Sequence, residues 1–242
     1  MKQYRRQAGV LLHPTSLPSP YGIGDLGHTA YRFVDFLEAA GQRYWQVLPL
    51  GHTGFGDSPY QCFSAAAGNP YLIDPDLLVE DGLLTADEVR AGDFEASPDT
   101  ADFEQLADTR WPLFRKAYSR ANAALRKKIH TFTEANAEWL PDYALFMALK
   151  EEKYHDMPVY MWPDNAVRDR KPAALEKVTE ELRDEIDFRI FLQYIFFEQW
   201  TALRTYANEK GIKIIGDIPI YVSADSADVW VHPTLFKLKA DK

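Results

Sequence analysis

Polar residues follow the apolar, strand-like stretches of this sequence, at the positions where parallel α/β folds carry their chemistry. The segments concerned are residues 13–17, 49–56, 56–61 and 216–219. Because the carboxyl ends of parallel strands meet at one edge of a sheet, side chains placed there can form a common site. Asp217 is the acidic candidate that this reasoning favours, and a turn or capping role is the alternative.

Residues 56–61, with the sequence GDSPYQ, combine turn-forming residues with a tyrosine. Asp57 and Ser58 precede Pro59, and this composition favours a turn over a direct catalytic role. Tyr60 can either pack into the core or stack against a ligand, because its ring is apolar and its hydroxyl is polar.

The other candidate residues are given structural interpretations. His13, at the end of a strand, is expected to be a hydrogen-bonded structural histidine, and Trp45, inside a strand, is expected to be a core residue. Asp225, Ser226 and Asp228 are expected to cap the helix that follows them rather than to bind a metal ion.

Several well-known chemistries have no matching motif in this chain. It contains no GxGxxG after the first strand, no GxxxxGK[ST], no GxSxG and no HExxH. The 6 histidines are scattered and there is 1 cysteine, so no zinc-binding set is expected. Cys62 has no evident partner base, which argues against a cysteine nucleophile.

Composition narrows the class of protein further. The 242 residues include 27 Lys and Arg against 36 Asp and Glu, and the net charge of −9 argues against nucleic-acid binding. One cysteine allows no internal disulfide and favours a reducing compartment. The apolar stretch at residues 8–12 is too short for a signal peptide, and no run has the length of a membrane span. We therefore expect a cytoplasmic protein without nucleic-acid or membrane partners.

The elements that would position the candidate residues begin with a βαβ unit. Residues 8–12 and 44–48 are predicted strands, and the helix between them is expected to be capped by Thr29 and to end at Gly41. Such a unit places its two strands in parallel. A third strand is predicted over residues 212–215.

Residues 77–208 are predicted to be mainly helical. Asp142 is expected to cap the helix that follows it. The pattern over residues 173–208 indicates a helical stretch with a break near residues 184–188, which ends at Gly211. Because three parallel strands cannot close a barrel, the sequence predicts an α/β fold that holds only part of one.

Several ordered motifs resemble the amylomaltases, also called 4-α-glucanotransferases or disproportionating enzymes. In chain order they are GVLLHPTSLP (9–18), YGIGDLG (21–27), YWQVLPL (44–50), GDSPYQ (56–61), AGNPYLI (67–73), DYALF (142–146), IIGDIPI (214–220) and DSADVW (225–230). They occur in the family's order, so the resemblance covers nearly the whole chain.

The resemblance implies a partial, α-amylase-like (β/α)8 TIM barrel with a large, mainly helical insertion. It implies transfer of α-1,4-glucan segments between maltooligosaccharides by a retaining double displacement, with no metal or organic cofactor. Ser58 and Tyr60 resemble residues that line the donor subsites, and Asp217 resembles the strand-end Asp beside the reacting sugar. Phe55 departs from some relatives, which carry a Tyr there in a second glucan-binding patch.

The resemblance also places the catalytic residues outside this sequence. The nucleophilic Asp and the acid Glu are expected after residue 242, so no catalytic residue is assigned and the isolated chain is expected to be inactive. A non-catalytic α-glucan-binding remnant is the alternative function. The predicted parts are the first barrel βαβ unit with the donor-site loop (1–76), the mainly helical insertion with barrel helices (77–208), and the third barrel strand with its truncated following loop (209–242).

Overall fold

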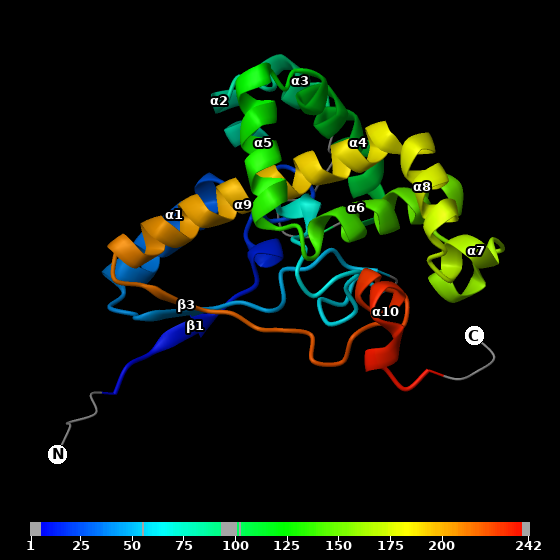
Figure 1. The fold of residues 1–242 in the computed structure, drawn as a ribbon. Helices are drawn as coiled ribbons and strands as arrows, with labels where there is room; N and C mark the ends of the chain where they lie inside the picture. The colour runs from blue at the N-terminus through cyan, green and yellow to red at the C-terminus, as the bar shows by residue number, and fades with distance from the viewer. Residues whose placement is uncertain (1–5, 55, 93–100, 102, 239–242) are drawn as a thin grey trace. The chain divides into compact units, whose positions relative to one another are not determined.

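The computed structural model describes residues 6–54, 56–92, 101 and 103–238 (Figure 1), so the interpretation of Phe55 lies outside the described residues. The chain divides into two compact units. Unit 1 comprises Met1–Leu50, Asn69–Ala121 and Ile195–Ile218. Unit 2 comprises Gly51–Gly68, Asn122–Tyr194 and Pro219–Lys242. The three predicted parts stay a prediction.

Unit 1 contains a parallel sheet of three strands. They are β1 (Gly9–Leu11), β2 (Tyr44–Gln46) and β3 (Lys213–Ile215), in the order β1-β2-β3. Main-chain pairing extends past the strand ends, because Leu12 N–H donates to the Gln46 carbonyl at 3.0 Å. The three predicted strands are therefore confirmed, each slightly shorter than expected.

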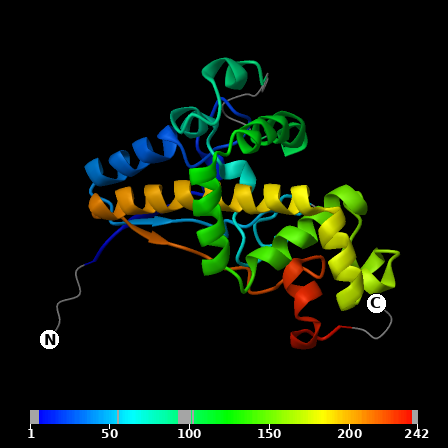
Figure 2. The same ribbon diagram turned by 45° about the horizontal axis from the view of Figure 1, so that its top comes forward.

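Helices pack on one face of this sheet. The helices within unit 1 are α1 (His28–Ala39), α2 (Pro75–Glu80), α3 (Ala86–Arg90) and α4 (Phe103–Ser119). Trp45 of β2 is fully buried, and its ring lies edge-on to Phe33 of α1 with centroids 5.1 Å apart, which confirms it as a core residue. The C-terminal half of α9 (Arg183–Glu209) runs beside α1, as Figures 1 and 2 both show.

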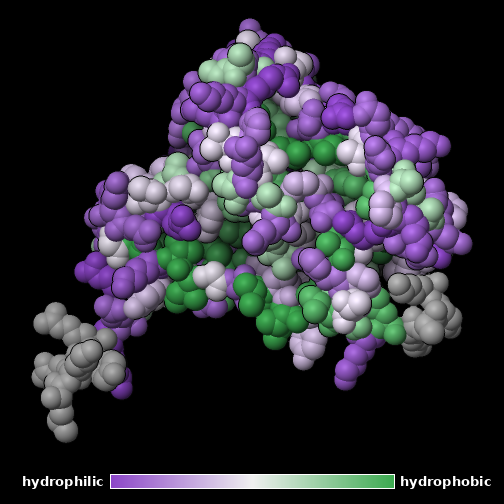
Figure 3. Space-filling model, viewed as in Figure 1, coloured by the Kyte–Doolittle hydropathy of each residue, from purple (hydrophilic) through white to green (hydrophobic). Residues whose placement is uncertain are grey.

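The opposite side of the sheet is open. Leu11 of β1 is 56% exposed and Ile215 of β3 is 43% exposed. Figure 3 shows hydrophobic surface over this strand region. Apolar side chains at this exposure gain little from burial, so the open face is a place where more protein could pack.

Unit 1 also contains three buried ionisable side chains, those of Asp25, Asp74 and Arg110. Asp25 and Asp74 are both 3% exposed, and their carboxyl groups are hydrogen-bonded to each other. Burial, together with the charge of Asp25, raises the pKa of Asp74 to about 8. Arg110 of α4 is fully buried nearby and donates to the carbonyls of Ile73 and Tyr21, at 2.9 and 3.1 Å.

Unit 2 is mainly helical. Its elements are α5 (Ala123–Ala135), α6 (Leu140–Ala148), the π-helical turn η3 (Leu149–Lys153), α7 (Asn165–Arg168), α8 (Pro172–Glu181), the first half of α9, and α10 (Ala227–Val231). Short 3-10 turns occur in both units at Pro14–Ser16, Pro70–Leu72, Val159–Met161 and Pro233–Leu235. The core of unit 2 contains an aromatic group in which Trp162 lies 5.6 Å from Phe146 and 5.7 Å from Trp230, between ring centroids.

The helix ends show which local signals decide the structure. Gly41 and Gly211 follow helices with φ of +69° and +76°, so both predicted ends are confirmed, since glycine adopts this left-handed conformation freely. The predicted cap at Thr29 is wrong, because α1 begins at His28 with Gly27 as its N-cap. A Cβ on Gly27 would lie 1.6 Å from Asp74 Oδ2, so a tertiary contact fixes this helix start.

Two expectations in the helical region are also corrected. Asp142 is not an N-cap, because α6 begins at Leu140 and the Asp142 carboxylate pairs with Arg170 at 2.6 Å. The break in the long helical stretch falls at Leu182, between α8 and α9, a few residues earlier than predicted.

Candidate functional site

Ser58 and Tyr60 lie near the tip of a hairpin loop, defined here as residues 52–63 of unit 2. Its two arms pair through Gly54 N–H to the Gln61 carbonyl at 2.9 Å and Phe63 N–H to the His52 carbonyl at 3.0 Å. An antiparallel bridge joins Thr53 and Cys62. The described residues of this stretch therefore form an ordered hairpin rather than an irregular connection.

The tip of the hairpin loop is a compact turn. Gly56 and Asp57 both have positive φ, 81° and 53°, and aspartate tolerates this conformation better than most residues. The Ser58 hydroxyl accepts the Tyr60 N–H at 3.4 Å, and the Ser58 carbonyl accepts Gln61 N–H at 2.9 Å. The predicted turn is confirmed, and it leaves Tyr60 45% exposed.

Two side chains in the arms of the hairpin loop, His52 and Cys62, are buried and held in unreactive protonation states. His52 is 5% exposed, and burial beside the cations Arg189 and Lys150 lowers its pKa to about 3, so its ring is neutral at physiological pH. Cys62 is a buried free thiol whose pKa is raised, chiefly by burial, which keeps it from forming a nucleophilic thiolate. The tip, rather than the arms, is the part that could contact a substrate.

Asp217 follows β3 in unit 1 and is exposed to solvent. Its Oδ1 accepts the N–H of Ile218 at 2.8 Å, a local bond typical of turns. Because β1 is parallel, His13 leaves the sheet at the same edge. Burial lowers the pKa of His13 to about 4, and its Nδ1 has no partner among the described residues, so the expected hydrogen bond is not found at this atom.

The predicted binding residues thus fall into two groups. Ser58 and Tyr60 lie together in unit 2, whereas Asp217 belongs to unit 1. Each lies in a segment that follows a strand, as expected from the sequence. Joint binding of one ligand by all three residues stays a prediction.

The polar residues at the start of α10, namely Asp225, Ser226 and Asp228, make contacts that the sequence alone did not indicate. Ser226 is the N-cap and accepts Val229 N–H, which confirms one of the three expected caps. Asp225 instead accepts Lys150 Nζ at 2.7 Å and Val159 N–H at 2.9 Å. Asp228 accepts the N–H of Ala65 at 2.9 Å. The partners of the two aspartates are distant in sequence, so no local pattern could have identified them.

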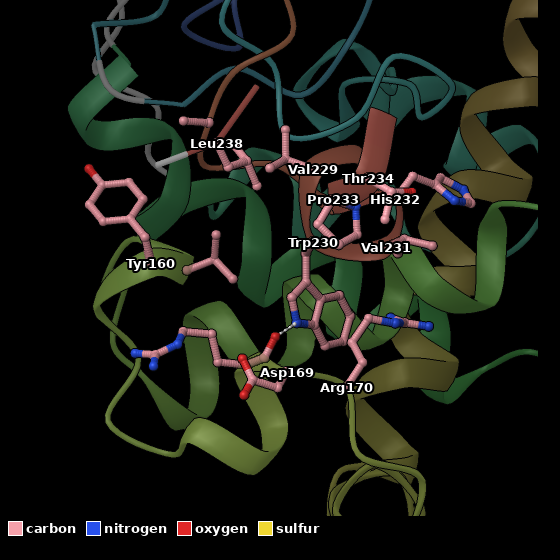
Figure 4. Close-up of a pocket in the computed structure, with 13 residues that line it drawn as sticks. Tyr160, Asp169, Arg170, Val229, Trp230, Val231, His232, Pro233, Thr234 and Leu238 are labelled. Atoms are coloured by element: carbon pink, nitrogen blue, oxygen red, sulfur yellow. Dashed lines mark hydrogen bonds between the residues drawn. The ribbon is translucent and has the colours of Figure 1, made fainter. Parts of the chain in front are cut away.

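A cavity of about 940 Å³ lies against α10 in unit 2 (Figure 4). Its wall includes Tyr160, Arg168, Arg170, Trp230 and His232, and none of the predicted binding residues. The indole N–H of Trp230 donates to the Arg168 carbonyl at 3.1 Å, and the Arg170 guanidinium lies 4.3 Å from the centroid of its ring system. Because Trp230 is already covered and satisfied, it offers no open face for sugar stacking.

Two further features are absent from the described ranges. No group of three or more His, Cys, Asp or Glu residues among them is placed to hold a metal ion. No helix in the part of the chain that the structure describes combines the length and apolar character needed to cross a membrane.

Comparison with known proteins identifies the family. A family-wide sequence profile described as 4-alpha-glucanotransferase, glycoside hydrolase family 77, matches residues 12–242. The 4-alpha-glucanotransferase of Streptococcus pneumoniae serotype 4 is 48% identical over 235 residues, which are 96% of this chain and 46% of that protein. The Thermus thermophilus enzyme of the same name is also 48% identical, over 237 residues with the same coverage.

A solved structure agrees over the whole chain. The amylomaltase from Streptococcus agalactiae in complex with acarbose superposes with a TM-score of 0.94 and 44% identity, and covers 98% of this chain and 48% of that one. The chain thus spans about half the length of the relatives it matches. Together, the profile, the relatives and the structure show that this chain belongs to the 4-α-glucanotransferase family.

Proposed function

We propose that the protein containing this chain is a 4-α-glucanotransferase that transfers α-1,4-glucan segments between maltooligosaccharides. The observation that carries the proposal is the family match over residues 12–242. The acarbose bound to the Streptococcus agalactiae relative supports α-glucans as ligands. The single cysteine, Cys62, fits a reducing compartment such as the cytoplasm.

We further propose that the sheet is part of an α-amylase-like (β/α)8 barrel. The parallel order β1-β2-β3 and the helices on one face of the sheet both fit this architecture. Within the described ranges, β1 and β3 pair with no further strand, and Leu11 and Ile215 expose apolar surface. Closing the barrel would cover that surface with additional strands.

Ser58, Tyr60 and Asp217 are the residues that we assign to glucan binding. Tyr60 is 45% exposed, and a tyrosine ring can stack on the apolar face of a glucose unit while its hydroxyl forms hydrogen bonds. Asp217 can accept sugar hydroxyls through its carboxylate, and such charge-assisted bonds are stronger than neutral ones. The turn that links Ser58 to Tyr60 fixes the positions of the two residues relative to each other.

The reaction would proceed by two displacements at the anomeric carbon. A nucleophilic Asp attacks that carbon while a Glu protonates the leaving glycosidic oxygen, which requires the two carboxyl groups to lie roughly 5–5.5 Å apart. The 4-hydroxyl of an acceptor then displaces the enzyme, with the Glu removing its proton, so the α configuration is retained. We place both acids in polypeptide that follows residue 242, which fits the chain's coverage of about half its relatives.

Maltotriose provides the test. The complete protein, incubated with maltotriose, is expected to yield glucose and a series of longer maltooligosaccharides, separated by anion-exchange chromatography. Glucose and maltose alone would indicate hydrolysis instead of transfer. Binding of maltooligosaccharides without any product would favour the non-catalytic remnant. Residues 1–242 alone are expected to give no turnover, because they lack the reacting acids.

A further inference from the structure

We infer that Asp228 of α10 is a positioning residue for the hairpin loop that carries Ser58 and Tyr60. The inference rests on the proposed role of that loop in glucan binding. Asp228 does not reach a substrate-binding residue itself. It acts through the main chain of residues 63–65, the segment in which the chain leaves the hairpin loop.

Two neighbouring residues of α10 hold two alternate residues of that segment. Ala227 N–H donates to the Phe63 carbonyl at 2.8 Å, and the Asp228 carboxylate accepts Ala65 N–H at 2.9 Å. The segment bends at Phe63 and Ala65, and this course brings the main-chain groups of both residues to the start of α10. The first turn of α10 therefore fixes both the position and the register of the segment.

The position of α10 is itself well defined. Ser226 is fully buried, and its hydroxyl both accepts Val229 N–H at 3.2 Å and donates to the Ser223 carbonyl at 2.7 Å. The preceding Asp225 binds Lys150, whose side chain is 3% exposed. Asp228 thus extends from a helix start that other contacts already fix, which a positioning group requires.

Phe63 connects this contact to the hairpin loop. Its ring lies edge-on to His52 with centroids 5.4 Å apart, and the Lys150 ammonium lies 5.0 Å from its centroid. Its N–H pairs with His52 across the two arms. Displacement of the segment at Ala65 would therefore shift the arm that leads back to Tyr60.

The test compares two aspartates that accept main-chain N–H groups in unit 2. Asp228→Ala removes the bond to Ala65. Asp164→Ala is the matched control, since Asp164 caps α7, a different element, by accepting Ala166 and Val167 N–H at 2.9 and 3.2 Å. Asp228→Asn keeps an oxygen that can accept the bond without its charge. All three variants are made in the complete protein and assayed for disproportionation of maltotriose.

The expected result separates binding from chemistry. Asp228→Ala should raise KM for maltotriose by about tenfold with kcat within about twofold, because one charge-assisted bond is lost. Asp228→Asn should recover part of this loss, and Asp164→Ala should keep wild-type kinetics although its Tm falls comparably. Equal kinetic parameters for Asp228→Ala and Asp164→Ala would overturn the inference.

Amide hydrogen exchange gives a readout that does not depend on activity. In Asp228→Ala, residues 52–65 should exchange faster than in the wild type, while the same residues stay unchanged in Asp164→Ala. Unchanged exchange in Asp228→Ala would overturn the positioning role. A wild-type protein without transferase activity would overturn the proposed function instead, and the exchange data would still decide whether Asp228 holds the loop.

Discussion

Two glutamines on α9 hold the main chain in the same way in the two units. Gln193 in unit 2 binds both the N–H and the carbonyl of Gly68, at 2.8 and 2.9 Å, and Gln199 in unit 1 binds both groups of Asp74, at 2.8 and 3.2 Å. Each amide replaces the hydrogen bonds that a neighbouring strand would supply. We call these two contacts the glutamine clamps. They are alike, but the charged groups around them differ.

The difference lies in how each unit compensates its buried charges. In unit 2, Arg189 pairs with Glu151 and Glu185, so opposite charges face each other directly. In unit 1, Asp25 and Asp74 face each other and share a hydrogen bond, which requires a proton on the pair. In unit 2 the buried acids are thus paired directly with a cation, whereas in unit 1 the two acids share a proton beside the buried Arg110.

The largest expected effect comes from breaking the ion pairing of unit 2. Arg189→Ala would leave Glu151 and the buried Glu185 without their cation, at a cost of about 3–5 kcal/mol in the free energy of unfolding. Lys153→Ala is the control, since both side chains of the Lys153–Glu181 pair reach solvent and the pair should contribute below about 1 kcal/mol. Urea unfolding measures both, and equal losses would show that burial does not distinguish the two pairs.

A smaller effect is expected from the two glutamine clamps. Gln193→Ala and Gln199→Ala each leave a buried N–H and a buried carbonyl without partners, so each should lose about 2–3 kcal/mol. The unfolding free energies of the two variants check whether the clamps are equivalent. A loss confined to Gln193→Ala would mean that water satisfies the main chain of Asp74 when Gln199 is absent.

The smallest expected effect is the pH dependence of stability that comes from the buried acid pair of unit 1. Because the folded pKa of Asp74, about 8, lies above its unfolded value, its proton stabilises the fold at low pH, and this contribution is lost as pH rises toward 8. The lowered pKa values of His13 and His52 act in the opposite direction, but only below their unfolded value of 6.5.

Stability measured between pH 6.5 and 8 therefore isolates the acid pair. The free energy of unfolding should fall by at most about 1.4 kcal/mol per pH unit in the wild type. Asp74→Asn, which resembles the protonated acid, should remove this slope. A slope that persists in Asp74→Asn would assign it to another group.

Sequence patterns predicted the features that depend on neighbouring residues. The three strands follow from short apolar runs, and the helix ends at Gly41 and Gly211 follow from the conformational freedom of glycine. The turn at Asp57 and Ser58 follows from its composition in the same way.

Features that depend on distant partners could not be predicted. Thr29 has the chemistry of a cap, but the close approach of Gly27 to Asp74 sets the start of α1. Asp225 and Asp228 look like caps and instead bind residues of other segments. The partner of a side chain that could bind several groups is known only when the fold shows which of these groups lies near it.

The hairpin loop has a practical consequence for engineering. Its arms are paired to each other and held at the base, while residues 56–60 form a turn whose side chains carry little of the packing. A combinatorial library confined to residues 57–60, with Gly56 kept for its backbone conformation, would vary the side chains at the tip while leaving the scaffold intact. This makes the tip the natural starting point for testing the proposed role in glucan binding.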